Sequence, residues 1–352
     1  MERLEWIYNG MLSAVVIGTL IFLTRHKELK PKLIIRTGFA CSAVAILLAL
    51  MLSSGSIFGL MRLCCWAIFA HGVVWLGVTA LITRRSGRWL THICLSLAIL
   101  LAGVGIDAFL IEPSWLQVTT YKLKTPRVSR TIRIALLADL QTDHITAWER
   151  SVLERMMARR PDVILVAGDT LQLRPEHWTR ERDALRRLWR ETHVEAPMGV
   201  VVVGGNTDTA AWPTIYEGLG AHTIEQTQIV DLGDVVVTGL SEIESFNTDA
   251  RVHRPDERYH IVLGHSPDFA LGTIDADLSV AGHTHGGQVQ IPFVGPILTF
   301  AQIPRSWADG LTSVSKDHTL VVSRGIGMER LDAPRLRFWC RPQLVLIELS
   351  PT

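Results

Sequence analysis

The sequence lacks the positive charge that a nucleic-acid-binding surface requires. Its 352 residues carry 35 Lys and Arg against 34 Asp and Glu, which leaves a formal net charge of +1 at pH 7. Binding to a polyanion depends on clustered Lys and Arg that displace counterions from the phosphate backbone. We therefore expect no nucleic acid among the partners of this chain.

Cysteine is also scarce and unevenly placed. Of the five cysteines, four lie in apolar runs near the N-terminus, at Cys41, Cys64, Cys65 and Cys94. Cys340 is the single cysteine in the remainder of the sequence. One cysteine cannot close an internal disulfide, so cysteine usage does not indicate a redox compartment.

Charged residues are nearly absent from long stretches within residues 1–112. A helix that crosses a bilayer needs about 20 consecutive apolar residues. On this basis we predict four membrane-spanning helices, near residues 6–24, 37–54, 63–82 and 89–111. No small-residue cleavage site follows the first stretch, which argues against a signal peptide. The composition therefore predicts an integral membrane protein with the lipid bilayer as a partner.

The loops between these helices carry a charge asymmetry. Basic residues fill the first loop and the third, at Arg25, Lys27, Lys30, Lys32, Arg36, Arg84, Arg85 and Arg88. Lys and Arg are enriched in cytoplasmic loops, so both loops are expected on the cytoplasmic side. The globular part after the fourth helix is then predicted to be extracytoplasmic.

His71 lies midway along the third predicted helix. An ionisable residue at this depth is a candidate functional group, but a neutral histidine hydrogen-bonded between helices is the simpler interpretation, and we adopt it. The sequence shows no inverted repeat and no charged helix interiors, so a transporter is not indicated. The four helices are interpreted as an anchor.

The rest of the chain alternates between strand-like and helix-like patterns. Unbroken Val, Ile and Leu runs, typical of strands buried on both faces, end at Ala138, Ala167, Gly204, Gly264 and Ala281. One helix is expected to begin at Thr146 with a capping box to Glu149, and another covers about residues 176–190. Further strands are expected in HTLVVS and QLVLIEL. This alternation predicts an α/β layered domain.

A polar cluster follows each of the five buried strands, where open α/β sheets bind their ligands. The clusters are Asp139-Leu-Gln141, Gly168-Asp169, Gly205-Asn206-Thr207-Asp208, Gly264-His265 and Gly282-His283-Thr-His285-Gly-Gly. Any single member has an ordinary explanation, such as helix capping, but the whole series does not. Carboxylates, an amide and imidazoles together suit divalent ions such as Mn, Fe or Zn. Two such ions can activate a water molecule and hold a phosphoryl group during its attack.

In this order the motifs A-x-D, G-D, G-N-x-D, G-H and G-H-T-H-G-G-Q resemble the calcineurin-like metallophosphoesterases, over about residues 131–350. Ile111-Glu112-Pro113 and a late Arg324-Gly-Ile-Gly segment are similar to a membrane-associated bacterial branch, which implies a bacterial inner membrane. The resemblance implies a β-sandwich flanked by helices. We accordingly divide the chain into a four-helix transmembrane anchor (1–112), a juxtamembrane linker (113–130) and a phosphoesterase domain (131–352).

The resemblance also implies two divalent metal ions, Mn, Fe, Zn or Mg, and roles for individual residues. Asp169 would bridge the ions. Asn206, His265 and His283 would complete one site, and Asp139 and His285 would belong to the other, where Gln141 is a further candidate ligand.

Two positions depart from the family pattern, which has histidine at both. Gln141 offers a weaker, harder oxygen ligand that favours Mn²⁺ or Mg²⁺. Thr207 cannot act as an acid near neutral pH, although general acid catalysis contributes about 10²–10⁴-fold. His144 is a candidate to replace either histidine, with an exposed loop histidine as the alternative. The catalytic candidates are Asp169, Asn206, His144 and Asp208.

Two functions therefore stay open. We favour an enzyme that hydrolyses a phosphoester or pyrophosphate bond of a phosphorylated substrate, with a lipid-linked phosphate as one candidate. The alternative is a catalytically weak or inactive sensor or assembly protein that binds metal and phosphate. Arg324 and Arg335 are candidate phosphate contacts or surface ion pairs. Ile291–Phe300 is apolar with two prolines, and we expect a packed irregular connection there rather than a lid or a membrane-dipping loop.

Overall fold

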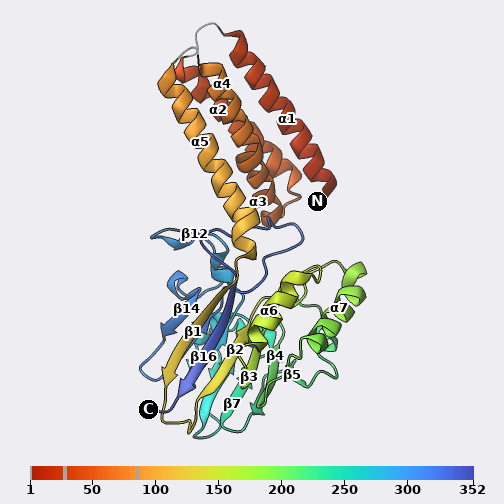
Figure 1. Cartoon of the computed structure of the whole chain (residues 1–352), viewed down its shortest axis with the longest axis vertical. Coiled ribbons are helices and arrows are strands. Elements are labelled where there is room, and N and C mark those ends of the chain that lie inside the picture. Colours follow the sequence, from red (N-terminus) through yellow and green to blue (C-terminus); the bar gives the residue numbers. More distant parts are fainter. Residues whose placement is uncertain (1, 27–29, 85–86) are drawn as a thin grey trace. The chain divides into compact units, whose positions relative to one another are not determined.

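The N-terminal part of the chain is helical (Figure 1). In this computed structural model, which describes residues 2–26, 30–84 and 87–352, four stretches are long and apolar enough to cross a membrane. They run Arg3–Arg25, Pro31–Leu52, Ile57–Thr83 and Arg88–Ser114, in agreement with the predicted spans. Lys27 and Arg85, which entered the prediction of orientation, lie outside the described residues.

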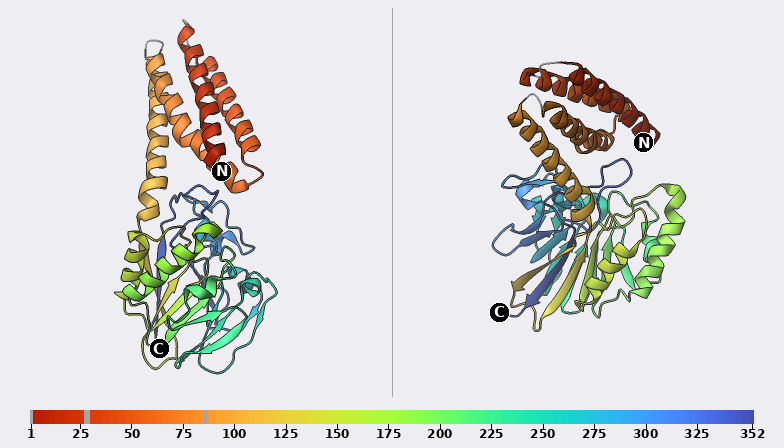
Figure 2. Two further views of the ribbon diagram at one scale, coloured as in Figure 1. Left: turned by 90° about the vertical axis from the view of Figure 1, so that its right-hand side faces the viewer. Right: turned by 45° about the horizontal axis from the view of Figure 1, so that its top comes forward.

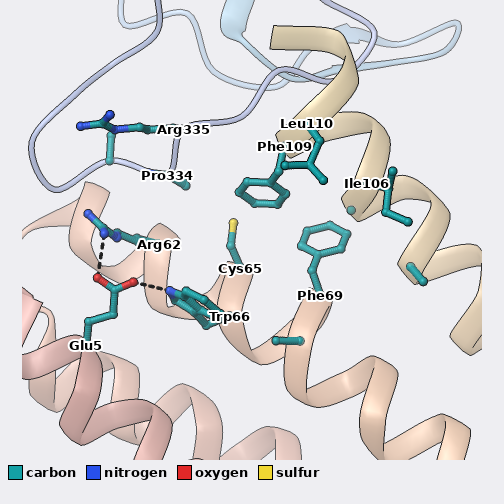
Figure 3. A pocket seen from close by; sticks show the side chains of 14 residues that line it. Glu5, Arg62, Cys65, Trp66, Phe69, Ile106, Phe109, Leu110, Pro334 and Arg335 are labelled. Carbon is teal, nitrogen blue, oxygen red and sulfur yellow. Dashed lines mark hydrogen bonds and ion pairs between the residues drawn. The ribbon is translucent and has the colours of Figure 1, made fainter. Parts of the chain in front are cut away.

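These stretches contain α1 (Glu2–Arg25), α2 (Pro31–Leu52), α3 (Ile57–Trp66), the π-helical η1 (Ala67–Gly72), α4 (Val73–Thr83), α5 (Arg88–Ile106), the π-helical η2 (Asp107–Ile111) and the short η3 (Glu112–Ser114). Several polar groups inside them are paired. His71 Nε2 lies 3.0 Å from Asn9 Oδ1, the interhelical hydrogen bond that we expected. Glu5 forms an ion pair with Arg62 at 2.7 Å and accepts a hydrogen bond from the Trp66 indole (Figure 3). Such pairing is required where no water is available to solvate a charge.

The chain divides into two units, Met1–Leu110 with Asp332–Arg335, and Ile111–Leu331 with Leu336–Thr352. The second unit contains two six-stranded sheets. The first has the order β1-β16-β2-β3-β4-β5, with β1 (Gln117–Lys124), β16 (Gln343–Ser350), β2 (Ile132–Leu137), β3 (Val163–Ala167), β4 (Gly199–Val203) and β5 (Ala221–Ile224). The second has the order β14-β15-β11-β9-β7-β6, with β14 (Gly310–Ser313), β15 (Thr319–Val322), β11 (Leu278–Ala281), β9 (Tyr259–Leu263), β7 (Val235–Gly239) and β6 (Gln228–Asp231).

The sheets pack face to face, and helices cover the outer face of the first. Along β2, Ile132, Ile134 and Leu136 enter the core between the sheets, whereas Ala135 and Leu137 enter a second core under α6 (Ala147–Met157) and α7 (Trp178–Glu191) (Figure 2). Successive side chains of a strand point to opposite faces, so both faces of β2 require apolar residues. The predicted α/β layers and the capping box of Thr146 with Glu149 are confirmed.

Residues 117–124 differ from our expectation of a linker. They form β1, which pairs in parallel with β16 from Gln117↔Gln343 to Lys124↔Ser350. The strand is at the edge of its sheet and alternates exposed with half-buried side chains. An edge strand of this kind contains many polar residues, so its apolar pattern is weak in the sequence. The domain consequently begins before residue 131.

The parallel strands bring the polar clusters to one region. In the first sheet β2, β3 and β4 run parallel, and in the second β7, β9, β11 and β15 run parallel. The carboxyl ends of parallel strands lie at the same edge of a sheet, which is where ligands bind in α/β folds. The remaining short elements include β8 (Arg251–Val252) with β10 (Thr273–Ile274), and β12 (Gln290–Ile291) with β13 (Gly295–Pro296).

The start of the second unit is fixed by Glu112. Its buried carboxylate accepts hydrogen bonds from the backbone N–H groups of Trp339, at 2.8 Å, and Cys340. A charged acceptor that serves two buried N–H groups is strongly held, because each group left unpaired costs about 1–3 kcal/mol. This contact joins the first residues of the unit to the segment that precedes β16.

Replacing Glu112 with alanine is expected to lower the free energy of unfolding by about 2–4 kcal/mol, because two backbone donors lose their acceptor. Urea titration of the detergent-solubilised protein, followed by tryptophan fluorescence, measures this change. Glu348→Ala is the matched control, since its 3.9 Å pair with Lys122 is partly exposed and contributes less than about 1 kcal/mol. Equal effects of the two substitutions would contradict the prediction.

Candidate metal centre

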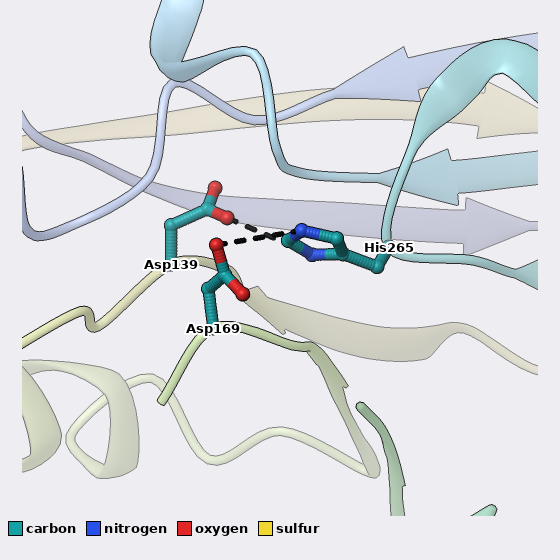
Figure 4. A group of neighbouring side chains, drawn as sticks. All are labelled: Asp139, Asp169 and His265. Carbon is teal, nitrogen blue, oxygen red and sulfur yellow. Dashed lines mark ion pairs between the residues drawn. The ribbon is translucent and has the colours of Figure 1, made fainter. Parts of the chain in front are cut away.

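Asp139, Asp169 and His265 meet at the carboxyl ends of strands from both sheets. Asp139 follows β2, Asp169 follows β3 and His265 follows β9. One ligand atom of each lies within 4.8 Å of the other two, and all three residues are buried (Figure 4). His265 Nε2 lies 3.4 Å from Asp169 Oδ2, and His265 Nδ1 lies 3.8 Å from Asp139 Oδ1. Three of the predicted ligands therefore form a group that is suited to a cation.

The predicted ligands share an unusual backbone conformation. Positive φ angles occur at Asp139 (47°), Gln141 (35°), Asp169 (50°), His283 (68°) and His285 (49°). This left-handed region is uncommon for residues other than glycine, and such strain concentrates at functional sites. The five conformations show that tertiary contacts, rather than local backbone preference, determine how these side chains point.

Glycine is required where the loops approach one another. A Cβ on Gly205 would lie 2.2 Å from Asp169 Oδ1 and 2.8 Å from His265 Cε1. A Cβ on Gly282 would lie 2.6 Å from Asp139 Oδ2. Any larger residue would displace a predicted ligand, so these glycines allow close approach of the backbone to the centre.

His265 is oriented by a backbone carbonyl. Its Nδ1 lies 2.7 Å from the carbonyl oxygen of Ala167, to which the N–H donates, and its Nε2 lies 2.9 Å from Asn206 Oδ1. Histidines that bind metals usually donate their second ring N–H to a carbonyl or a carboxylate, which leaves the other nitrogen free for the ion. His265 Nε2, Asn206 Oδ1 and Asp169 Oδ2 therefore converge as one set of donor atoms.

His283 lies beside this set. Its ring packs edge-on against Phe246, with the centroids 4.8 Å apart, and lies 5.1 Å from the ring of His265. Its backbone N–H donates to both carboxylate oxygens of Asp139, at 3.0 and 3.1 Å. Its Nε2 is 3.2 Å from the carbonyl oxygen of Phe300. His283 thus connects the first cluster with the last.

His285 is buried against a cation that the sequence analysis missed. The Arg337 guanidinium is fully buried, and its Nη2 lies 3.5 Å from His285 Nδ1. The Cys340 thiol donates to the carbonyl oxygen of His285 at 3.1 Å, which gives this cysteine a structural role. Arg337 also donates to the backbone carbonyls of Arg324, Gly325, Gly327 and Cys340. This buried arginine therefore holds the late glycine-rich segment beneath the centre.

The two arginines that we named from the sequence, Arg324 and Arg335, are found in other environments. Arg324 donates to Gln117 at 2.9 Å and lies 3.9 Å from Asp309. Arg335 belongs to the short segment that groups with the helical unit. The sequence signal for Arg337 is its place among apolar residues in the run Leu-Arg-Phe-Trp-Cys, since residues of these types are often buried.

Gln141 presents an oxygen without a partner. Both hydrogens of its buried amide are used, since Nε2 donates to Gln172 Oε1 and to Glu329 Oε2, each at 3.0 Å. These two acceptors determine which end of the amide is nitrogen. Its Oε1 is buried and has no hydrogen-bond partner in the part of the chain that the structure describes. A buried carbonyl oxygen of this kind needs a hydrogen-bond donor or a cation close to it, and a bound metal ion would supply the cation.

The third cluster is organised by backbone hydrogen bonds. Thr207 N–H donates to Asp169 Oδ1 at 2.8 Å. Asp208 accepts from Thr170 N–H and from Gly205 N–H, both at 2.9 Å, and so joins the loops after β3 and β4. The Thr207 hydroxyl is buried and unpaired among the described residues. Asp208 therefore positions two loops, and Thr207 orients the carboxylate of Asp169 through its backbone.

His144 is held away from the ligand group. Its ring is exposed and its Nδ1 lies 3.1 Å from Glu181 Oε1 on α7. Glu181 also accepts from Ile145 N–H at 2.9 Å, which fixes the loop on the helix. The structure thus brings Asp139, Asp169 and His265 together but pairs His144 with a helix.

Burial dominates the electrostatics of the centre. Burial raises the pKa of Asp139 to about 7 and lowers that of His283 to about 4. Burial also lowers the pKa of His265, but the carboxylates of Asp169 and Asp139 outweigh it and raise this pKa to about 10. Burial also raises the pKa of Asp169, but the positive charge of His265 outweighs burial and lowers this pKa to about 2. A proton on His265 thus provides a positive charge where the carboxylates converge, and the donor set fits a metal ion in its place.

Comparison with known proteins supports this chemistry. Residues 132–287 match the family of calcineurin-like phosphoesterases. The uncharacterized metallophosphoesterase YkuE of Bacillus subtilis is 29% identical, over 71% of this chain and 91% of that protein. The phosphodiesterase YaeI of Escherichia coli is 36% identical over 25% of this chain and 32% of that protein. The UDP-2,3-diacylglucosamine pyrophosphatase LpxG of Chlamydia trachomatis is 25% identical, over 67% and 90% respectively. Residues 132–287 therefore form a calcineurin-like phosphoesterase domain, which supports a phosphoester hydrolase.

Metal binding is expected to weaken as the pH falls from about 8 to about 6, because metal ligands must be deprotonated. Asp139, with a pKa of about 7, gains its proton in this range, and His265, with a pKa of about 10, carries throughout the range a proton that the metal ion must displace. Calorimetric titration with Mn²⁺ in two buffers of different ionisation enthalpy measures the affinity and the protons released. Asp169→Ala measures binding elsewhere, and an affinity that does not change with pH would contradict the prediction.

Proposed function

We propose that this chain is a membrane-anchored phosphohydrolase that uses two divalent metal ions to hydrolyse a phosphoester or phosphoanhydride bond. The observation that carries the proposal is the buried group of Asp139, Asp169 and His265 at the carboxyl ends of both sheets. The calcineurin-like phosphoesterase domain supports the same reaction class. The apolar helices support the anchor.

The contacts support the following assignment of ligands. Asp169 would hold both ions, because its carboxylate is close to donors from both sheets. Asn206, His265 and His283 would hold one ion with it, and Asp139, Gln141 and His285 would hold the other. When bound, the ions lower the pKa of a water molecule and neutralise charge on the phosphoryl group.

Residues of the chain prepare this site before any ion binds. The Ala167 carbonyl fixes the ring of His265, and the Thr207 N–H fixes one oxygen of Asp169. Asp208 holds the two loops together through Thr170 and Gly205. This preorganisation means that few groups need to move when metal and substrate bind.

Thr207 has a consequence for the substrate. The Thr207 hydroxyl does not donate a proton to the leaving group near neutral pH, so leaving groups that are stable as anions are preferred. Phosphoanhydrides and esters of acidic alcohols have such leaving groups. The name of LpxG includes a lipid-linked pyrophosphate, which supports the same class of bond and a lipid-borne phosphate as substrate. We propose an extracytoplasmic domain on the basis of the basic loops.

Loss of hydrolysis in Asp169→Ala is the test of the enzyme. We expect turnover of bis-p-nitrophenyl phosphate with Mn²⁺, reduced more than about 100-fold by Asp169→Ala, a larger loss than removal of an outer-shell partner causes. Asp231→Ala is the matched control, because Asp231 is exposed and lies on the edge strand β6. Metal content is measured on the same samples. Metal retained without turnover would favour the alternative, a protein that senses or assembles through bound metal and phosphate.

Gln141→His is expected to change the metal preference. An imidazole supplies nitrogen in place of the Gln141 oxygen, and nitrogen ligands favour Zn²⁺ over Mn²⁺, so the ratio of Zn²⁺ to Mn²⁺ affinity should rise roughly tenfold. Competition titration of the two ions measures this ratio. Gln228→His on β6 is the control for an added exposed imidazole. An unchanged ratio in Gln141→His would mean that residue 141 does not bind the metal.

A further inference from the structure

The segment after the G-H-T-H-G-G-Q motif forms a small hairpin with an apolar tip. β12 and β13 pair through Gln290↔Pro296 and Ile291↔Gly295. Phe293 is fully exposed, Val294 is 65% exposed, and exposures of 42% to 57% occur at Ile291, Ile297, Leu298 and Phe300. We expected a packed connection here, and for these side chains that expectation is wrong. Large exposed apolar patches mark surfaces that bind proteins or membranes.

The base of this hairpin is linked by hydrogen bonds, through Phe338 and Trp339, to Glu112 at the end of the fourth apolar stretch. Phe338 pairs with the stem, since its N–H donates to Gln288 and its carbonyl accepts from Gln290, both at 2.9 Å. The next residue, Trp339, donates its N–H to Glu112 at 2.8 Å. Glu112 itself lies within the stretch Arg88–Ser114. These hydrogen bonds therefore place the hairpin at the end of the second unit that contains Glu112, as Figure 1 shows for β12 and the start of β1.

Two exposed tryptophans lie at the same end. Trp115 is 51% exposed and Trp339 is 60% exposed. The Arg341 guanidinium stacks on the ring of Trp115, 3.5 Å from its centroid. Tryptophan and arginine are the side chains that accumulate at the level of lipid headgroups. Residues 289–300 contain no charged residue, so burial of the hairpin tip requires no charge to be desolvated.

The hairpin is also attached to the metal centre. The carbonyl oxygen of Phe300, at its end, is 3.2 Å from His283 Nε2. A Cβ on Gly287 would lie 2.6 Å from Pro296 Cβ, so the motif and the hairpin pack directly on each other. These two contacts therefore connect the hairpin with the segment that contains the predicted ligands His283 and His285.

We propose that residues 289–300 insert into the headgroup region of the same bilayer that holds the four helices, and so hold the metal centre at the level of lipid-borne phosphates. The inference rests on the proposed membrane anchor. A bilayer is the occupant that chain continuity supplies, because the apolar stretch that contains Glu112 continues directly into this unit.

Position-specific quenching tests the insertion. Phe293→Cys in the full chain is labelled with nitrobenzoxadiazole and placed in nanodiscs of phosphatidylethanolamine and phosphatidylglycerol. Ile229→Cys is the matched control, because Ile229 is 56% exposed on β6. The unsubstituted chain, labelled in parallel, corrects for its own cysteines. Groups at the interface lie about 5–10 Å into the headgroup and acyl boundary, so brominated acyl chains should remove more than about half of the Phe293→Cys emission and little of the Ile229→Cys emission.

Equal quenching at the two positions would overturn the insertion. Blue-shifted emission from Phe293→Cys that brominated lipids do not quench would also overturn it, and would indicate a protein, such as a second copy of this chain, on the hairpin. Turnover of bis-p-nitrophenyl phosphate and metal content are measured on the same samples. An active enzyme with a water-exposed hairpin defeats this inference alone, whereas a lipid-quenched hairpin without turnover defeats the proposed enzyme alone.

Discussion

Asp169 and His265 come from different sheets and meet at 3.4 Å in a buried region, where neither charge is tolerated alone. Much of the surrounding structure serves this contact. The Ala167 carbonyl and the Thr207 N–H orient the two side chains, and Gly205 leaves the space between them. The sandwich thereby uses a polar junction between its layers that is stable when a cation, either a proton or a metal ion, balances the carboxylates.

At one position of the proposed metal centre, an amide oxygen stands where the family pattern has an imidazole nitrogen. Gln141 replaces the histidine of the family pattern, and its amide is locked by Gln172 and Glu329 so that the oxygen remains unpaired among the described residues. A glutamine alone is a flexible ligand, but two acceptors on its nitrogen remove that freedom. The network therefore presents the carbonyl in advance, which is the property that a weak ligand needs in order to bind a metal ion.

Hydrogen bonds connect the first residues of the second unit with the hairpin and with the predicted ligands. Glu112 lies in the stretch Arg88–Ser114 and accepts a hydrogen bond from Trp339. The preceding residue, Phe338, is hydrogen-bonded to the base of the hairpin of β12 and β13. The same hairpin contacts His283 through Phe300. A membrane-facing hairpin next to the ligands is consistent with a hydrolase whose substrate lies in the bilayer, which we propose.

The sequence by itself determined the features that depend on local pattern. The length of apolar runs predicted the four helices, unbroken Val and Ile runs predicted the strands before Asp139 and Asp169, and the spacing of Thr146 and Glu149 predicted a helix start. It also named the residues that the structure gathers, because ligand types recur at strand ends.

Tertiary structure decided what depends on contacts between distant segments. Residues 117–124 became a strand because β16, more than 200 residues later, supplies its hydrogen bonds. Arg337 rather than Arg335 lies beneath the centre because buried carbonyls of the glycine-rich segment face it. His144 pairs with Glu181, and the apolar side chains of the hairpin are exposed. Each outcome reflects the pairing of buried polar groups across the fold, which short-range sequence pattern does not encode.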